Sequence, residues 1–326
     1  MENVKVTVLI TTYNCGEFIL QAIKSVLNQT YQDYELLIVD DGSTDNTENV
    51  IKTLNNKKIR YIKLEHVGRS KALNFGLKES KYDWIALMDA DDISHPLRLE
   101  EQVKHFPLKY NNVILTWSAY FSKNKILYTI ETPLVSEIIK KRLSLHSYIC
   151  NSSVLYNKNF ILGNGGYDEN TLRFEDYELW LRIKKMVEFL VVPQYYQFVR
   201  IRVNSSSNLN KFETRKLVYY IQDNYYKNFY ENFLIDNKIE ETQIRGWREY
   251  FYGDKKNARN EWKRVIYKKV DIRLVLAFLF TYMSTKFLNN IREFRIKLRL
   301  LFFIKKVTKT KKIQGDFQEL FEKINM

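Results

Sequence analysis

The sequence predicts an α/β fold in which a doubly wound, mostly parallel sheet is flanked by helices. A pattern of apolar strand, short loop and amphipathic helix occurs three times within the first 80 residues, and a fourth strand follows directly. Strands joined in this way pair in parallel through right-handed crossovers. Two of the four strands end in clusters of aspartate, as expected where an open α/β sheet binds a ligand.

Each predicted element of this first part rests on hydrophobic spacing. The strands are short runs rich in Val, Ile and Leu, and the helices carry apolar residues three or four positions apart. The predicted strands are Val4–Thr12, Tyr34–Val39, Ile59–Leu64 and the apolar run from Tyr82, and the predicted helices are Phe18–Leu27, Thr47–Leu54 and Gly68–Lys78.

The fourth strand ends in the acidic run D-A-D-D, which places carboxylates at Asp89, Asp91 and Asp92. Carboxylates this close repel one another, so they stay ionised together only beside a cation. A hard divalent ion with oxygen ligands meets that requirement. The alternative is an acidic turn in which Asp92 or Ser94 caps a helix that begins at Pro96.

A second acidic run, D-D-G-S-T-D, ends the second strand at Asp40 to Asp45. Parallel strands bring their carboxyl ends to one edge of the sheet, so we expect Asp40 and Asp41 to share a cleft with the three later aspartates. Carboxylates accept hydrogen bonds from ring N–H and hydroxyl groups but repel bare phosphate. The cleft therefore suits a nucleotide whose diphosphate is held through a metal ion.

Other nucleotide-binding classes are disfavoured by the same stretch. No G-x-G-x-x-G opens the first helix, and no G-x-x-x-x-G-K-[ST] occurs in the chain. These absences argue against a dinucleotide-binding dehydrogenase and a P-loop nucleotide hydrolase. The two cysteines, Cys15 and Cys150, are too few for a disulfide framework and indicate a reducing compartment.

The second part of the predicted domain is less regular. It comprises a hairpin of Val113–Phe121 and Ile126–Ile130, a helix over Ile138–Leu145, the loop G-N-G-G-Y-D-E over Gly163–Glu169, a helix over Arg173–Ile183, and extended chain over Glu188–Val192 and Tyr195–Arg202. Glu175 and Asp176 fall in the first turn of the second helix. The helix dipole favours acids there whatever the protein does, so their position alone does not show a catalytic role.

Five motifs in order carry a resemblance to a known family. They are V-T-V-L-I-T-T-Y-N, I-V-D-D-G-S-T-D, L-M-D-A-D-D, G-G-Y-D-E and E-D-Y-E-L-W-L-R. Together they resemble glycosyltransferase family 2, inverting enzymes with the GT-A fold, over about residues 3–200. The resemblance implies transfer of a sugar from a nucleotide diphosphate donor, often UDP-linked, to a hydroxyl of a saccharide or lipid-linked glycan. A role in bacterial surface polysaccharide biosynthesis follows as an expectation.

The resemblance also assigns the base and ribose contacts of the donor. Thr11, Tyr13 and Asp41 match the positions that hold the base, with Asp41 accepting from the base N–H. Asp89, the first acid of the D-x-D motif, matches a position near the ribose.

The diphosphate and metal contacts are implied in the same way. Asp91 matches the metal ligand, and Asp92 beside it is an alternative ligand for Mn²⁺ or Mg²⁺. Arg69 and Lys71 lie where the family often has basic or polar residues near the diphosphate.

On the acceptor side, Asp176 matches the general base of the family's E-D motif. Glu175, Gly166, Tyr167 and Trp180 lie in the neighbouring motifs and are expected around the acceptor. The resemblance therefore favours a catalytic role for Asp176 over a helix-start role alone.

The positive charge of the chain is concentrated in its last third. Of a net charge of +14, residues 211–326 hold 26 Lys and Arg against 14 Asp and Glu. We predict a catalytic domain over 1–209, with nucleotide-sugar binding in 1–110 and the acceptor side in 111–209, and a basic, aromatic-rich helical extension over 210–326. An appendage of this charge suits an anionic surface.

Within that extension, four apolar residues recur at helical spacing among arginines and lysines: Phe294, Leu298, Leu301 and Phe302. Such a helix lies on an anionic membrane or packs on the catalytic domain with a solvated basic face, and both alternatives stay open. The apolar run Leu274–Met283 is about half the roughly 20 residues that span a bilayer. With no signal peptide expected, the predicted location is cytoplasmic, and the open membrane alternative would place the protein peripherally on the inner face of the cell membrane.

The sequence gives less support to two other functions. A nucleotidyltransferase acting on nucleotide sugars usually needs a phosphate loop rich in Gly, Arg and Lys near the N-terminus, and none is present. A nucleic-acid-binding protein is suggested only by the basic charge and the 23 tyrosines, without a recognisable binding motif. We therefore expect no nucleic-acid partner.

Overall fold

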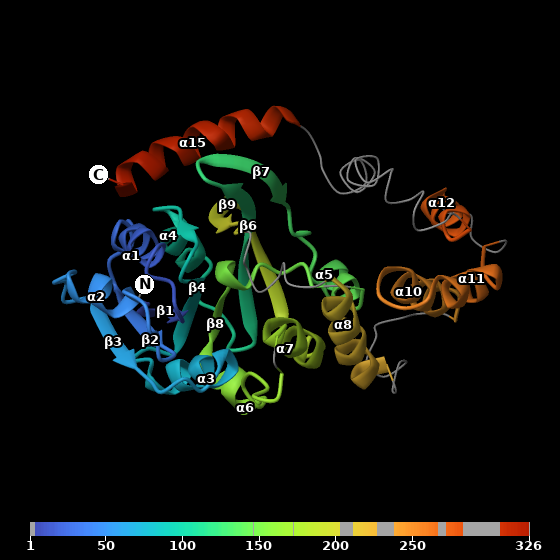
Figure 1. Cartoon of the computed structure of the whole chain (residues 1–326), viewed down its shortest axis with the longest axis horizontal. Coiled ribbons are helices and arrows are strands. Elements are labelled where there is room, and N and C mark those ends of the chain that lie inside the picture. The colour runs from blue at the N-terminus through green and yellow to red at the C-terminus, as the bar shows by residue number, and fades with distance from the viewer. Residues whose placement is uncertain are drawn as a thin grey trace. The chain divides into compact units, whose positions relative to one another are not determined.

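The computed structural model describes residues 4–145, 147–171, 173–202, 211–226, 238–266, 272–282 and 307–325 (Figure 1). The chain forms two compact units. The first comprises Met1–Ile139, Tyr148–Val203 and Val307–Met326, and the second comprises Lys140–Ser147 and Asn204–Lys306. The first unit is therefore discontinuous in sequence, and it contains all the site residues predicted above.

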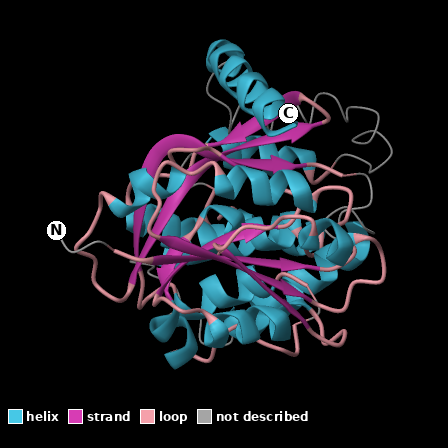
Figure 2. Cartoon of the chain, turned by 90° about the vertical axis from the view of Figure 1, so that its left-hand side faces the viewer, coloured by secondary structure: helices cyan, strands magenta, loops and turns pink. Residues whose placement is uncertain are grey.

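Within the described residues, nine strands form one sheet in the order β3-β2-β1-β4-β8-β6-β9-β5, with β7 paired to β6. The strands are β1 Val6–Thr12, β2 Tyr34–Asp40, β3 Ile59–Lys63, β4 Trp84–Asp89, β5 Ile93–Ser94, β6 Asn112–Ser122, β7 Lys125–Ile130, β8 Leu155–Asn157 and β9 Glu188–Arg200. Figure 2 shows these strands in magenta among the helices in cyan.

The parallel pairing predicted for the first four strands is present in β3-β2-β1-β4. Beyond β4 the sheet also contains antiparallel pairs. β8 is antiparallel to β4 and β6, while β6 and β9 are parallel. Between β6 and β7 only two residues intervene, with Lys123 in the left-handed region (φ 57°), and so short a turn joins only antiparallel strands.

Helices cover both faces of the parallel half. The helices of the first unit are α1 Ile19–Leu27, α2 Thr47–Lys52, α3 Arg69–Glu79, α4 Arg98–Val103, α6 Lys158–Gly163, α7 Glu175–Ile183 and α15 Val307–Asn325, with a 3₁₀ helix η1 at Asn151–Ser153; α5, Ser136–Leu143, contains the unit boundary. On β1, Val6, Val8 and Ile10 pack with α1. Leu9 points the other way, where a Cβ added to Gly76 of α3 would lie 2.6 Å from it. The alternation of a strand thus explains the two helix layers.

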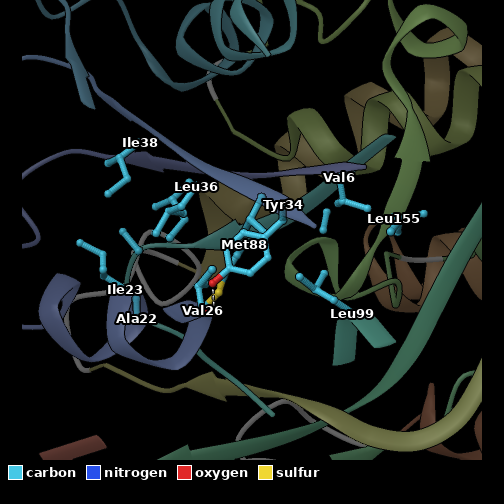
Figure 3. Close-up of a cluster of buried hydrophobic side chains, with 14 of the residues drawn as sticks. Val6, Ala22, Ile23, Val26, Tyr34, Leu36, Ile38, Met88, Leu99 and Leu155 are labelled. Carbon is cyan, nitrogen blue, oxygen red and sulfur yellow. Dashed lines mark hydrogen bonds between the residues drawn. The ribbon is translucent and has the colours of Figure 1, made fainter. Parts of the chain in front are cut away.

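A large buried cluster lies between the sheet and α1. Ala22, Ile23 and Val26 of α1 are almost completely buried, together with Leu36 of β2 and Met88 of β4 (Figure 3). Burying each large apolar side chain contributes about 1.5–3 kcal/mol. This core fixes the strands whose ends carry the acidic motifs.

The second unit is helical, with α8 Lys211–Tyr226, α10 Lys238–Phe251, α11 Lys255–Lys263 and α12 Ile272–Phe280. Its core includes Trp262, which lies 4.9 Å from Trp247 between ring centres. Among the helices that the structure describes, none is long and apolar enough to cross a membrane. The basic amphipathic segment predicted around Phe294–Phe302 lies outside the described residues.

The last helix, α15, differs from the predicted division of the chain. The sequence placed all of 210–326 in one extension, whereas α15 packs on the first unit. Its buried residues, Ile313, Phe317, Leu320 and Ile324, form one stripe and join a cluster with β5, β6, β7 and β9. The stripe explains the difference, because an apolar helix face is stable only against another apolar surface.

Candidate active site

The two acidic motifs meet where the structure places the ends of β1, β2 and β4. Thr11 of β1 is in register with Asp89 of β4, and Thr12 is in register with Asp40 of β2. The strand order changes direction at β1: β2 and β3 lie on one side of β1, and β4 lies on the other. Open α/β sheets bind ligands at such a switch point, outside the carboxyl ends of the strands. Thr11 is buried at this edge.

Asp41 and Tyr13 form the outer part of the edge together with His66, which the sequence analysis did not single out. The Tyr13 and His66 rings stack, with centres 4.2 Å apart and planes 21° apart. His66 Nδ1 lies 3.1 Å from Asp41 Oδ2. Backbone N–H groups of Val67 and Gly68 donate to the same carboxylate at 2.7 and 3.1 Å. Two half-exposed rings thus lie beside a buried carboxylate.

Arg69, at the start of α3, joins two of the predicted acids. Its Nη2 lies 2.5 Å from Asp89 Oδ1, and its Nε lies 2.6 Å from Glu175 Oε1. The bridge ties β4 to the first turn of α7. Lys71, two residues further along α3, is exposed, and no ion pair involving it is found within the described part of the chain.

Asp91 and Asp92 have different surroundings. Asp91 Oδ2 lies 2.7 Å from Nε of Arg202, whereas Asp92 is 2% exposed and accepts a hydrogen bond from the Arg200 backbone N–H at 2.9 Å. Burial and the nearby carboxylates, Asp89 among them, raise the pKa of both groups, an effect that Arg202 opposes at Asp91. Asp92 is thus turned toward β9, and its role as a metal ligand stays a prediction.

Few side chains in this site are therefore available as metal ligands. In the part of the chain that the structure describes, no group of three or more His, Cys, Asp and Glu side chains is placed to hold a metal ion. Asp89 and Asp91 are a pair of carboxylates at one strand end. Such a pair fits a hard cation that takes its remaining oxygen ligands from substrate phosphates.

Asp176 lies in the first turn of α7, directly after a residue with unusual backbone geometry. Phe174, which precedes the helix, has φ 62° and ψ 32°, a conformation that costs a non-glycine residue about 1–3 kcal/mol. Burial, reinforced by the charge of Glu175, raises the pKa of Asp176 to about 7. Its carboxylate accepts a hydrogen bond from the Tyr177 N–H at 2.7 Å. A carboxylate with this pKa can take up a proton near neutral pH.

The G-G-Y loop is held from two sides. Asn74 of α3 bonds both the N–H and the C=O of Tyr167 at 2.8 Å, and Arg182 of α7 donates to the Gly166 carbonyl at 2.6 Å. Gly166 has φ +65°, and an added Cβ would lie 2.6 Å from Asn74 Oδ1. Tyr167 and Trp180 are buried, so they lie beneath the surface on which an acceptor was expected. The loop connects α3 and α7 behind Asp176.

A second residue that sequence reasoning missed is Arg98, which is 1% exposed beneath the acidic strand end. Its guanidinium donates to the carbonyls of Leu87 and Val154 and to Gln197 at 2.9–3.2 Å. Burial lowers the pKa of Arg98 to about 10, so it stays a cation under the aspartates. The only signal was its position after S-H-P-L, which by itself predicts a helix start.

Comparison with known proteins identifies the family. Residues 7–163 match the family model described as Glycosyl transferase family 2. A glucosyltransferase of Escherichia coli, WfaP, is 30% identical over 213 residues, which cover 64% of this chain and 81% of that protein. The chain belongs to glycosyltransferase family 2. The relative WfaP is named as a UDP-Glc:α-D-GlcNAc-diphosphoundecaprenol β-1,3-glucosyltransferase.

Other glycosyltransferases match more of the chain. An uncharacterised glycosyltransferase of Rickettsia prowazekii is 25% identical over 322 residues, covering 94% of this chain and 97% of the relative. One from Methanocaldococcus jannaschii is 29% identical over 263 residues, covering 77% and 87%. The likeness to the first relative extends through the C-terminal part.

Solved structures show that this family 2 glycosyltransferase has the predicted GT-A fold. Staphylococcus aureus TarS 1–349 in complex with UDP-GlcNAc superposes with a TM-score of 0.57 and 17% identity, covering 85% of this chain and 79% of that one. The mannosyltransferase PcManGT of Pyrobaculum calidifontis, in complex with GDP-Man and Mn²⁺, gives a TM-score of 0.54 with 14% identity, covering 98% and 86%. The prediction of an α/β glycosyltransferase is confirmed.

Proposed function

We propose that this glycosyltransferase moves a sugar, with inversion, from a UDP-linked donor to a hydroxyl of a saccharide or lipid-linked glycan in bacterial surface polysaccharide biosynthesis. The observation that carries the proposal is Asp176, a carboxylate with a pKa of about 7 next to an acid that Arg69 bridges to the D-x-D strand end. The UDP-GlcNAc bound by TarS and the lipid-linked acceptor in the name of WfaP support the donor and acceptor classes.

On the donor side, the Asp41 carboxylate accepts the N–H of the base, and Tyr13 offers a ring face for stacking. His66 already occupies this position with a planar ring whose nitrogen lies beside Asp41. This contact supports the proposal that a flat heterocycle with a ring N–H binds the Asp41 carboxylate. Thr11 and Asp89, neighbours in the sheet, are assigned to the base and the ribose.

The residues proposed at the diphosphate are Arg69 and Lys71, together with the metal ligand Asp91. Asp91, with Asp89 beside it, would hold Mn²⁺ or Mg²⁺, which when bound neutralises the departing diphosphate. The Mn²⁺ in the PcManGT complex supports this assignment. Asp92 is an alternative ligand only if it turns away from β9, because its carboxylate already accepts a backbone hydrogen bond there.

Asp176 acts as the general base. It accepts the proton of the acceptor hydroxyl while that oxygen attacks the anomeric carbon from the face opposite the leaving group. Glu175 keeps Arg69 in place, and the loop at Gly166 and Tyr167 is bonded to Asn74 of α3 and to Arg182 in the last turn of α7. Trp180 lies on the buried face of α7.

The test is calorimetric titration of UDP, GDP and TDP with Mn²⁺ and then with EDTA, followed by transfer assays. We expect one nucleotide to bind, and we expect Asp176→Asn to keep that affinity while turnover falls about 10²–10⁴-fold. Asp316→Asn, at an exposed position of α15, is the matched control. Loss of nucleotide affinity in Asp176→Asn, with unchanged turnover per bound donor, would contradict the base role.

The C-terminal part is proposed to attach the enzyme to an anionic membrane surface, where lipid-linked acceptors reside. The basis is the basic amphipathic segment of the sequence, and the structure adds a condition to the experiment. Truncation after Leu209 would also delete α15, so the informative variant replaces Arg295, Lys297 and Arg299 by Gln. Equal sedimentation of this variant and the wild type with anionic vesicles would reject the attachment.

A further inference from the structure

The C-terminal helix α15 is fastened to the first unit along its described length. Its apolar stripe includes Phe317, whose ring centre lies 4.7 Å from Phe121 of β6 and 4.9 Å from Phe198 of β9. The same buried cluster contains Ile93 of β5, the residue directly after Asp92. In Figure 1, α15 (red) runs across β7 toward α1.

Hydrogen bonds hold α15 at two points in addition to this packing. Gln314 accepts from the Ile126 N–H at 2.7 Å and donates to the Asn124 carbonyl at 2.9 Å, at the turn between β6 and β7. Near the other end of the helix, Asn325 accepts from Gln21 of α1 at 2.6 Å. The helix therefore connects α1 to the β6–β7 hairpin.

One residue, Arg200, joins α15 to the acidic strand end by two routes. Its guanidinium lies over the Phe121 ring at 4.6 Å, and Phe121 contacts Phe317. It also donates to Gln21 at 2.6 Å, the residue that Asn325 bonds. An apolar route and a polar route from α15 thus end on the same side chain.

Arg200 in turn fixes the backbone of the acidic run. Its Nε donates to the Asp91 carbonyl at 2.8 Å, and its backbone N–H donates to the Asp92 carboxylate at 2.9 Å. Both contacts fix the backbone from which the Asp91 side chain projects.

We propose that α15, acting through Arg200, positions Asp91 for donor binding although neither α15 nor Arg200 contacts substrate. We call the contacts that join α15 to Arg200, and Arg200 to the Asp91–Asp92 backbone, the clasp. The role of Asp91 rests on the proposed function, whereas the clasp rests only on the contacts above. Arg200 is a positioning residue, and α15 sets the donor affinity of a site formed by residues more than 200 positions earlier in the chain.

The first arm of the test is independent of any nucleotide. Hydrogen exchange is compared among wild type, Phe317→Leu, Asn325→Ala and the control Gln318→Ala, which changes an exposed residue of the same helix. We expect faster exchange of the Asp92 and Arg200 amides in the first two variants, with β1 and β2 unchanged. Unchanged exchange at Asp92 and Arg200 would overturn the clasp. Phe317→Leu keeps most of the apolar volume, so the folded protein remains available for measurement.

The second arm measures donor affinity and turnover with UDP-GlcNAc as the probe. We expect Arg200→Met, Phe317→Leu and Asn325→Ala to raise KM for the donor about 5–50-fold with kcat nearly unchanged, and Arg200→Lys to recover part of the loss. Faster exchange with unchanged KM would show a purely structural helix and overturn the positioning role. If wild type binds no nucleotide, the proposed function fails, while the exchange arm still decides whether the clasp exists.

Discussion

The raised pKa of Asp176 predicts that catalysis and folding stability both depend on the protonation of this one carboxyl group. Burial and Glu175 raise this pKa from the ordinary 3.8 to about 7. The folded protein therefore keeps a proton on Asp176 between pH 4 and 7 that the unfolded chain loses. Folding stability falls as the pH rises through that window, because the carboxylate must be ionised in a site that disfavours its charge.

The magnitude follows from the size of the change. Each pH unit of displacement corresponds to about 1.4 kcal/mol, so three units give about 4 kcal/mol as a ceiling. Asp176 is partly exposed, and we therefore expect about half of this. Asp176→Asn should stabilise the protein by about 2 kcal/mol at pH 8 and by almost nothing at pH 4, while transfer is lost.

Urea unfolding at pH 4, 6 and 8 measures the stability difference, and the pH dependence of kcat/KM in wild type measures the catalytic side. Below about pH 7 we expect kcat/KM to fall roughly tenfold per pH unit, because only the ionised carboxylate accepts a proton. Asp316→Asn, at an exposed carboxylate, serves as the control for a general effect of removing charge. An Asp176→Asn gain that is the same at pH 4 and pH 8, or an acid limb centred near pH 4, would refute the reasoning.

Three further predictions follow from the site. Gly166→Ala should destabilise the fold by about 2–4 kcal/mol, because φ is +65° and the new Cβ meets Asn74. Gly315→Ala in α15, which has open space around it, should stabilise the fold by up to about 1 kcal/mol. Chemical denaturation of both variants measures the two changes. Tyr13→Ala should weaken UDP binding roughly tenfold by calorimetry while Tyr13→Phe keeps it, and equal affinities would exclude base stacking. EDTA should abolish UDP-GlcNAc turnover and added Mn²⁺ should restore it; full activity in EDTA would remove Asp91 from the metal site.

The elements of the parallel half could be predicted because local pattern determines them. The predicted helix Phe18–Leu27 is α1 within one residue, and the predicted strand Tyr34–Val39 is β2 within one residue. Apolar periodicity decides such elements, and the register of parallel strands then brings Asp89 beside Thr11. By contrast, β5 and β8 have two and three residues, too few to show any period.

Contacts between distant segments were beyond sequence reasoning. Arg69 was expected near a diphosphate, but nothing in the sequence indicates its pairing with Glu175, 106 residues away. His66 gave no signal, since its relation to Asp41 depends on how two loops meet. The stripe on α15 predicts a buried face without saying what covers it. The assignment of Asp176 came from the family resemblance, and its raised pKa arises from burial that only the folded chain displays.

The return of α15 to the first unit affects how this protein is made. Gln314 bonds Ile126 across 188 residues, so the ribosome synthesises the whole second unit before the apolar face of β6 and β9 can be covered. Until then Phe121 and Phe198 lack their cover, and exposed apolar surface on a nascent sheet promotes aggregation. Expression of the first 209 residues alone should therefore yield insoluble protein, and co-expression of a peptide spanning 307–326 should restore its solubility.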